Sequence, residues 1–182
     1  MESLTEPDKA WFVMRDLKRP NAKLPAYRQL SDAGFEVFTP LMPKILTRGT
    51  KRVKESVPVI HDLLFVNSTR SFLDPVVART DTLQYRYVKG GGYCDPLIVP
   101  TQDMERFIHA VESGARVDYY RPDEIPRSMY GSRIRIIDDG PLNGYECILL
   151  TVRGSKKRRV LVELPGILTA AIEVRPDFIQ PL

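Results

Sequence analysis

The sequence has few of the residues that metal and cofactor sites use. It contains two cysteines, Cys94 and Cys147, without CxxC spacing, and two histidines, His61 and His109, neither of them beside a cysteine. Zinc sites draw their ligands from closely spaced cysteines and histidines, so we expect no metal and no other cofactor. Because the spacing also gives no disulfide framework, both thiols are expected to be free in a reducing cytoplasm.

Signatures of catalysis and of membrane insertion are scarce as well. The triplet at 90–92 is not followed by the Gly-Lys-Ser/Thr of a phosphate-binding loop. No Gly-x-Ser-x-Gly elbow occurs, and Asp138-Asp139 precede Gly-Pro, which indicates a turn. No apolar run approaches the roughly 18 residues that span a bilayer, and the acidic first residues are not typical of a secretory signal. We therefore expect a cytoplasmic protein that is not an enzyme and does not contact a membrane.

The composition limits the number of domains and the kind of partner that the chain can bind. With 182 residues, 43% of them hydrophobic, the chain suits one ordinary domain or two small ones. Fifteen prolines favour short elements. The formal charge of +4 suits a nucleic acid or another anionic partner, although many unrelated proteins have the same excess.

The first part of the chain predicts an α+β domain over residues 1–115. Strands are predicted at 11–14, 35–38, 63–66, 85–88 and 97–99. Helices are predicted from Asn21, as N-cap with Pro25 in the first turn, to Gly34; from Asp74 or Pro75 to Arg79; and from Thr101, as N-cap, to Gly114. This order of elements favours a sandwich of helices on a mainly antiparallel sheet.

The second part predicts a linker followed by a small β-domain. Residues 116–128 contain two prolines, many charges and no periodicity, which indicates a linker. From 129 to 182, short apolar runs are divided by Asp-Gly-Pro, Asn-Gly, Arg-Gly-Ser-Lys-Lys and Pro-Gly. Such strands and turns are typical of a small antiparallel barrel.

Several sequence pieces occur in an order that resembles the NusG-like transcription factors. They are WFVM at 11–14, FEVFTPLMPK at 35–44, KRVKESVPV at 51–59, LLFV at 63–66, PLIVPTQDMERF at 96–107, GSRIRIIDDGPLNG at 131–144 and VLVELPGI…IEV at 160–174. The resemblance covers nearly the whole chain. It implies an NGN-type α/β sandwich at 1–115 and an SH3-like KOW β-barrel at 129–182.

The resemblance also implies a function. NusG-like proteins are not enzymes; they bind transcribing RNA polymerase through the NGN domain, suppress pausing and termination, and recruit the ribosome or a termination factor through the KOW domain. Where general NusG proteins carry Phe-Pro-Gly-Tyr, this chain has Ile60-His61-Asp62-Leu63, and the Ile-Phe-Gly loop is replaced by Leu164-Pro165-Gly166-Ile167. The missing aromatic favours operon-specific antiterminators, such as RfaH and the UpxY proteins of surface-polysaccharide operons.

Candidate contact residues follow from their positions in these motifs. Apolar side chains expected to receive a helix of the polymerase are Ile60, Leu63 and Ile98, with Phe12 beneath them. The KOW partner, for which the ribosome is one candidate, is expected at Leu164 and Ile167. The alternative for the polymerase residues is an ordinary place in the core.

Basic residues are expected to contact the non-template DNA strand of the transcription bubble. They are Arg15, Lys18, Arg19, Lys23 and, from the resemblance, Arg79. The N-terminus of the first helix would add N–H donors for phosphate. Two further basic segments are expected: Lys44–Lys54 in an exposed hairpin that approaches upstream DNA or the polymerase lobe, and 156–159 in a turn. For all of them the alternative is a solvated charged surface, with RNA contact left open for 156–159.

Two other functions remain open at this point. One is a general NusG that acts with Rho and the ribosome; under the preferred function as well, we expect the protein to be a monomer. The other is an RNA-binding or ribosome-associated protein, because KOW barrels also occur in ribosomal proteins.

Overall fold

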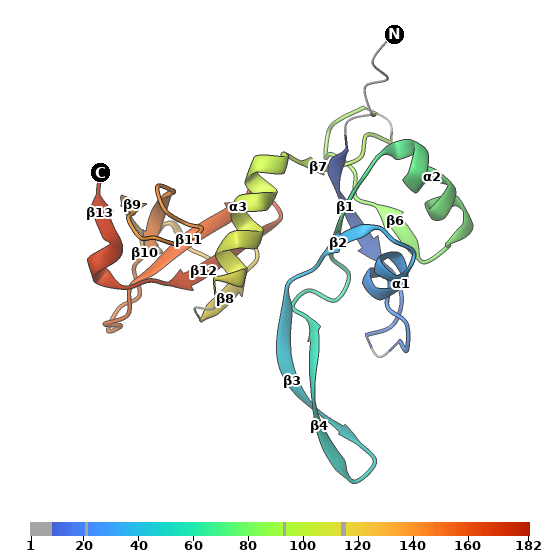
Figure 1. Ribbon diagram of the computed structural model, residues 1–182, viewed down its shortest axis with the longest axis horizontal. Coiled ribbons are helices and arrows are strands. Elements are labelled where there is room, and N and C mark those ends of the chain that lie inside the picture. Colours follow the sequence, from blue (N-terminus) through green and yellow to red (C-terminus); the bar gives the residue numbers. More distant parts are fainter. Residues whose placement is uncertain (1–8, 21, 93, 114–115) are drawn as a thin grey trace. The chain divides into compact units, whose positions relative to one another are not determined.

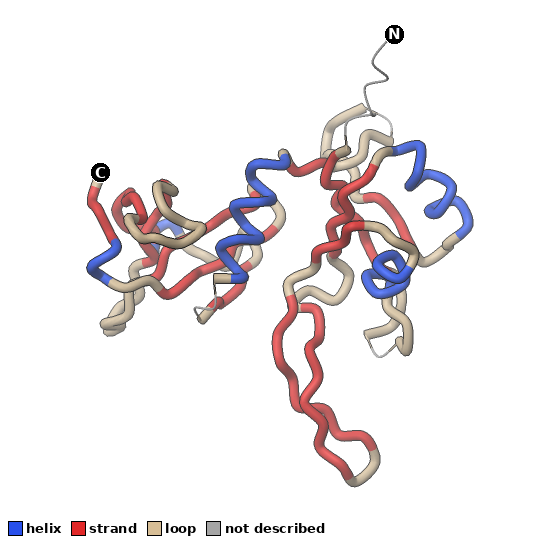
Figure 2. Tube along the Cα trace, in the orientation of Figure 1, coloured by secondary structure: helices blue, strands red, loops and turns tan. Residues whose placement is uncertain are grey.

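The computed structural model describes residues 9–20, 22–92, 94–113 and 116–182, and shows a mixed α+β chain with antiparallel sheets (Figures 1 and 2). The chain divides into two compact units, residues 1–101 and 102–182. Asn21 and Gly114, the expected N-cap and helix end, lie outside the described residues. In the part of the chain that is described, no helix has both the length and the apolar character to cross a membrane.

The first unit is built on an antiparallel sheet around strand β1. Its order is β2-β5-β1-β6, with β7 also paired to β1. The strands are β1 (Ala10–Asp16), β2 (Glu36–Phe38), β5 (Leu64–Ser68), β6 (Leu83–Tyr85) and β7 (Ile98–Val99). Each of these runs contains at least one aromatic or β-branched residue, which favours a strand. The predicted α+β class is confirmed.

Two helices pack on one face of this sheet. Helix α1 (Ala26–Asp32) contributes Leu30 and helix α2 (Arg70–Arg79) contributes Leu73 to a core that also holds Phe12 and Met14 from β1. Because side chains alternate along a strand, Phe12 and Met14 share the face that the helices cover. The apolar residues that alternate along β1 are therefore buried beneath the helices.

Helix α2 begins earlier than the sequence predicts. The carbonyl of Thr69 accepts the N–H groups of Phe72 and Leu73 at 3.2 and 3.1 Å, and Pro75 lies inside the helix instead of at its start. An interior proline removes one hydrogen bond. The fully buried Leu73 holds the preceding turn against the sheet, so tertiary packing outweighs that loss.

A long hairpin forms a separate two-stranded sheet of the first unit. Strand β3 (Leu41–Arg48) pairs with β4 (Lys51–Pro58) along their whole length, and Figure 1 shows the hairpin reaching away from the other strands of this unit. At the turn, Gly49 has a φ of +63°, which glycine adopts without steric cost. The predicted basic hairpin is confirmed and is longer than its basic segment.

The second unit contains a six-stranded antiparallel sheet in the order β13-β9-β10-β11-β12-β8. Its strands are β8 (Val117–Tyr120), β9 (Tyr130–Ile136), β10 (Glu146–Leu150), β11 (Arg159–Leu164), β12 (Leu168–Glu173) and β13 (Ile179–Pro181). Among the described strands, the edges β13 and β8 do not pair with each other, so the sheet is open where a closed barrel was predicted. Pro181 ends the three-residue β13 and has no backbone N–H to extend the ladder.

The boundary between the units also differs from the predicted one. Helix α3 (Thr101–Glu112) belongs to the second unit from its second residue on, and the guanidinium of Arg106 lies 5.0 Å from the centre of the Tyr145 ring. Within the expected linker, β8 pairs with β12. The apolar period of a helix does not specify which sheet the helix packs on. The prolines of 116–128 indicated a linker, although a short strand precedes them.

Candidate functional site

A buried carboxylate fixes the loop that carries most of the expected DNA-binding residues. Asp16 is only 4% exposed; its Oδ1 accepts the N–H of Lys18 at 2.9 Å and its Oδ2 accepts the N–H of Ala26 at 2.7 Å. The first backbone N–H of α1 is therefore already bonded to a negative group. This differs from the expected role of that helix end in binding phosphate.

The backbone brings the five predicted DNA-binding residues to one end of the first sheet. Arg15 lies in β1, and Lys18, Arg19 and Lys23 follow in the β1–α1 loop. The N–H of Leu17 donates to the carbonyl of Thr82 at 2.8 Å, which places the segment after Arg79 beside this loop.

The five side chains differ in how free they are to bind a ligand. The Nε of Arg15 lies 3.4 Å from Oδ2 of Asp62. The ammonium of Lys18 donates to Leu24 O at 2.8 Å and to Gln29 Oε1 at 2.7 Å. The Nε of Arg79 donates to the carbonyl of Pro75 at 3.0 Å. In contrast, Arg19 and Lys23 are exposed and have no ion pair within the described residues.

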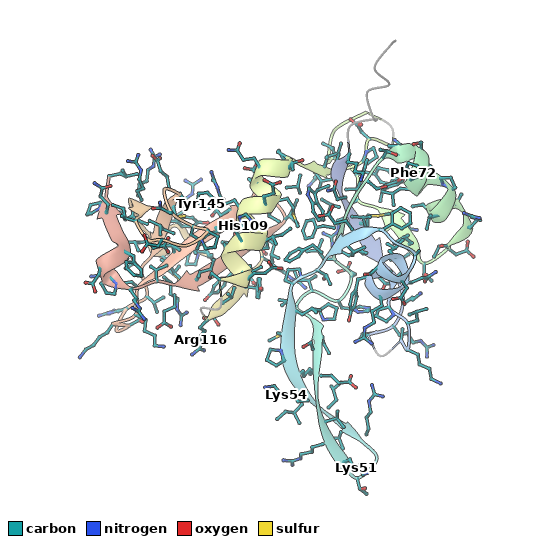
Figure 3. The ribbon with its side chains drawn as sticks, in the orientation of Figure 1. Lys51, Lys54, Phe72, His109, Arg116 and Tyr145 are labelled. Atoms are coloured by element: carbon teal, nitrogen blue, oxygen red, sulfur yellow. The ribbon has the colours of Figure 1, made fainter. Side chains whose placement is uncertain are left out.

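The hairpin is the second basic surface. Residues 41–58 contain five basic residues and one acidic residue, a formal charge of +4 that equals the charge of the whole chain. Only Arg48 is paired, to Glu55 at 2.6 Å, when the described residues are considered. Figure 3 shows Lys51 at the tip and Lys54 farther back along β4. The other basic side chains are those of Lys44 and Arg52.

Exposed apolar side chains accompany these charges. Ile45 is 67% exposed, Met42 47%, Leu41 43% and Val53 37%. A free two-stranded ribbon has no core on either face, so its apolar side chains remain available to a partner. None of them was predicted as a contact residue, although apolar residues stand among the basic ones throughout 41–54.

The residues predicted to bind polymerase are not gathered on one exposed surface. Phe12 is 3% exposed and packs against Tyr85, with ring centres 5.7 Å apart, and Leu63 is 2% exposed. Ile60 is half-buried. Ile98 is 47% exposed and pairs with Phe12 across β7 and β1, so it is the member of the set with the most accessible side chain.

The two residues expected to contact the KOW partner are buried in the second unit. Leu164 is 1% exposed at the end of β11 and Ile167 is 8% exposed in the following turn, where its N–H donates to Leu164 O at 3.0 Å. Pro165 and Gly166 form the exposed part of the turn. A partner that approached this loop would meet those two residues first.

A pocket of about 310 Å³ lies in the second unit, lined by residues of α3 and of strands β9 to β11. On its wall, hydrogen bonds from Arg135 and Arg133, at 2.8 and 3.0 Å, hold the pKa of Glu146 below its usual range. Burial raises the pKa of the Cys147 thiol to about 11. At neutral pH this thiol is protonated and is a poor nucleophile.

Comparisons with known proteins assign no family. No protein-family model matches the chain, and no curated protein matches it either. Among the described residues, no group of three or more His, Cys, Asp or Glu side chains is placed to hold a metal ion. The two basic surfaces of the first unit are therefore candidate contact surfaces on the ground of their charge and exposure alone.

Proposed function

We propose that this protein is a NusG-like transcription elongation factor that binds RNA polymerase and suppresses pausing and termination. It would serve as an operon-specific antiterminator in the cytoplasm, of the kind found at surface-polysaccharide loci. The observation that carries the proposal is the projecting hairpin of the first unit, which combines exposed apolar and basic side chains. Such a ribbon can reach a large, partly charged assembly without any change in the core beneath it.

In this proposal the first unit is the NGN-type domain and the second unit is the KOW-type domain. Two helices on one face of an antiparallel sheet support the first assignment, and the consecutive short strands β9 to β12 support the second. The hairpin and Ile98 contact polymerase. Burying each large apolar side chain contributes roughly 1.5–3 kcal/mol, so a few of them suffice for specific binding.

The β1–α1 loop then contacts the non-template strand. Arginine and lysine side chains bind phosphates and position a protein on a strand without reading its bases. Arg19 and Lys23 carry most of this contact because they are exposed and form no ion pair with any residue that the structure describes. Arg15 and Lys18 contribute less, since binding would have to break their existing contacts with Asp62 and Gln29.

The direct test is transcription in vitro with purified RNA polymerase on templates with and without candidate leader sequences. We expect the protein to shorten pauses, and to do so on one template more than on another. The double variant Arg19→Gln/Lys23→Gln should lose the template dependence while it still copurifies with polymerase. The matched variant Arg70→Gln/Lys89→Gln removes the same charge from exposed positions outside the loop and should behave as wild type. No copurification and no change in pausing would refute the proposal.

A general NusG that acts with Rho and the ribosome is the second candidate. Leu164 and Ile167 are buried and the loop between them lacks an aromatic residue, which disfavours it. Firm retention of Rho in a pull-down with the intact protein would reverse this preference. RNA binding without any affinity for polymerase would favour a ribosome-associated protein instead.

A further inference from the structure

The positive charge of the second unit is concentrated in one loop. Residues 102–182 contain twelve basic and twelve acidic residues and are therefore neutral overall. The stretch 151–159, which joins β10 to β11, nevertheless holds five basic residues and no acidic residue. A neutral unit with such a loop has a strongly positive end, which attracts polyanions.

Intramolecular ion pairs use only part of this charge. Lys157 pairs with Glu173 at 3.0 Å and Arg159 with Asp118 at 2.7 Å. Arg153, Lys156 and Arg158 are exposed and have no ion pair within the described part of the chain. As far as the described residues go, three cations thus remain free for an external anion.

An aromatic side chain and a further arginine lie in the segment that begins beside this loop. The N–H of Val174 donates to the carbonyl of Arg158 at 2.9 Å, which brings the segment after β12 alongside the loop. In that segment the guanidinium of Arg175 lies 5.9 Å from the centre of the Phe178 ring, and Phe178 is 36% exposed. Proteins that bind a single strand use basic side chains for its phosphates and accessible aromatic rings for its bases.

The loop itself is held in shape by local hydrogen bonds. The N–H of Ser155 donates to Val152 O at 3.1 Å, and the N–H of Lys157 donates to Ser155 Oγ at 3.2 Å. Gly154 has a φ of +80° and completes the turn. A loop ordered in advance loses less conformational entropy when it binds.

We propose that this end of the second unit binds single-stranded nucleic acid. Arg153, Lys156 and Arg158 contact successive phosphates, and the Arg175–Phe178 pair stacks with a base. The site is separate from the surfaces assigned to polymerase and to the non-template strand, and it does not depend on them. A single strand fits better than a duplex because its bases are free to stack on the ring.

Fluorescence anisotropy with the full chain tests the site. The probes are a labelled mixed-sequence RNA 12-mer and the DNA 12-mer of the same sequence, each titrated over a series of salt concentrations. Arg153→Gln/Arg158→Gln should weaken binding and reduce the salt slope by about 1.4, since each phosphate contact with a single strand contributes about 0.7. The RNA and DNA arms show which of the two strands binds more tightly.

Two further variants separate charge from stacking. Arg121→Gln/Arg133→Gln removes two exposed arginines of the same unit outside the loop and should leave the salt slope nearly unchanged. Phe178→Ala should weaken binding by about 5- to 150-fold, as loss of one stacked base does, without changing the salt slope. Circular dichroism of each variant checks that it is folded.

Three results would overturn the proposal. The first is an equal loss in the loop variant and in its matched control. The second is wild-type affinity and slope in the loop variant. The third is binding to phosphatidylserine vesicles with no binding to either oligonucleotide, which would make this end a membrane-binding surface instead. A 4-thiouridine RNA that crosslinks to peptides covering 151–159 or 175–178 would support the site.

Discussion

The carboxylate of Asp16 bonds to the backbone N–H of Ala26 at 2.7 Å and so ties the end of β1 to the start of α1. Ten residues separate the two in the chain, and the segment between them includes the exposed Arg19 and Lys23. The basic loop is thus closed at its base by one buried side chain. Its position, and therefore the strand contact proposed for it, depends on that side chain.

Replacing Asp16 by Ala should destabilise the protein by about 0.5–2 kcal/mol, the usual cost of a lost helix cap. The backbone N–H groups of Lys18 and Ala26 would lose their acceptor together. Urea unfolding followed by circular dichroism measures the change in the free energy of unfolding. Asp16→Asn keeps one acceptor oxygen and should cost less; an equal cost for both variants would show that the negative charge, not the hydrogen bond, is what matters.

The exposed apolar side chains of the hairpin give a second prediction. Ile45 is 67% exposed, so Ile45→Ser should change the free energy of unfolding by less than about 0.5 kcal/mol. If the hairpin contacts polymerase, the same change should lower the affinity for polymerase by roughly tenfold, because about 1.5 kcal/mol or more of burial is lost. Surface plasmon resonance with immobilised polymerase measures this.

The control for that prediction lies on the same strand. Thr47→Ser removes one methyl group from an exposed side chain next to the tip and should leave the affinity unchanged. Unaltered binding by Ile45→Ser would remove the hairpin from the polymerase interface, although other parts of the first unit could still bind.

The elements that follow from local sequence were predicted well. The run at 11–14, the basic hairpin and the period of Met104 and Phe107 each gave the correct type of element, because propensity and periodicity are properties of the segment itself. Whether a helix packs on one sheet or another is decided by distant residues. This explains why α3 was expected in the first unit and why the strand β8 was not predicted within the expected linker.

The candidate site was predictable in part and for the same reason. Charge is visible in the sequence, and the four basic residues from Arg15 to Lys23 lie at one end of the sheet, beside the segment that follows Arg79. Burial is a property of the assembled core, so Phe12 and Leu63 were expected beneath or along a groove, yet they are 3% and 2% exposed. The partners Asp62 and Gln29, which restrain Arg15 and Lys18, carry no signal in the sequence alone.

The two cysteines should differ sharply in reactivity. Cys94 is exposed, whereas Cys147 is buried and burial raises the pKa of its thiol from 9.0 to about 11. At pH 8 a disulfide reagent should modify Cys94 quickly and Cys147 only after denaturation, because the thiolate is the nucleophile. Rapid modification of two thiols per native chain would contradict the burial of Cys147.

The same pKa shift predicts a loss of stability at high pH. Because burial raises the pKa of the Cys147 thiol, the folded protein holds the thiol proton more tightly than the unfolded chain does. This difference contributes fully to the free energy of unfolding below about pH 9, and the contribution is lost as the pH rises towards 11. Each pH unit in that window costs at most about 1.4 kcal/mol. Cys147→Ala should therefore show a shallower fall in the free energy of unfolding between pH 9 and 11 than wild type, with Cys94→Ala as the control.

Gly131 provides the last prediction, because β9 passes very close to the strand beside it. A Cβ added at this position would lie 2.7 Å from Thr151 Oγ1 and 2.9 Å from the carbonyl oxygen of Leu149. The register between β9 and β10 shifts between Ile148 and Leu150, at the same place. A methyl group there must displace backbone, so Gly131→Ala should destabilise the protein by about 1–3 kcal/mol.

A second glycine of the same unit gives the matched control for Gly131→Ala. At Gly140 the nearest atom to an added Cβ is Oδ2 of Asp138, at 3.4 Å, which is ordinary contact with a flexible side chain. Gly140→Ala should therefore leave the free energy of unfolding within about 0.5 kcal/mol of wild type, with little change in the urea midpoint. Equal midpoints for the two variants would mean that β9 can move away from Leu149, and the close approach would then be no constraint on the second sheet.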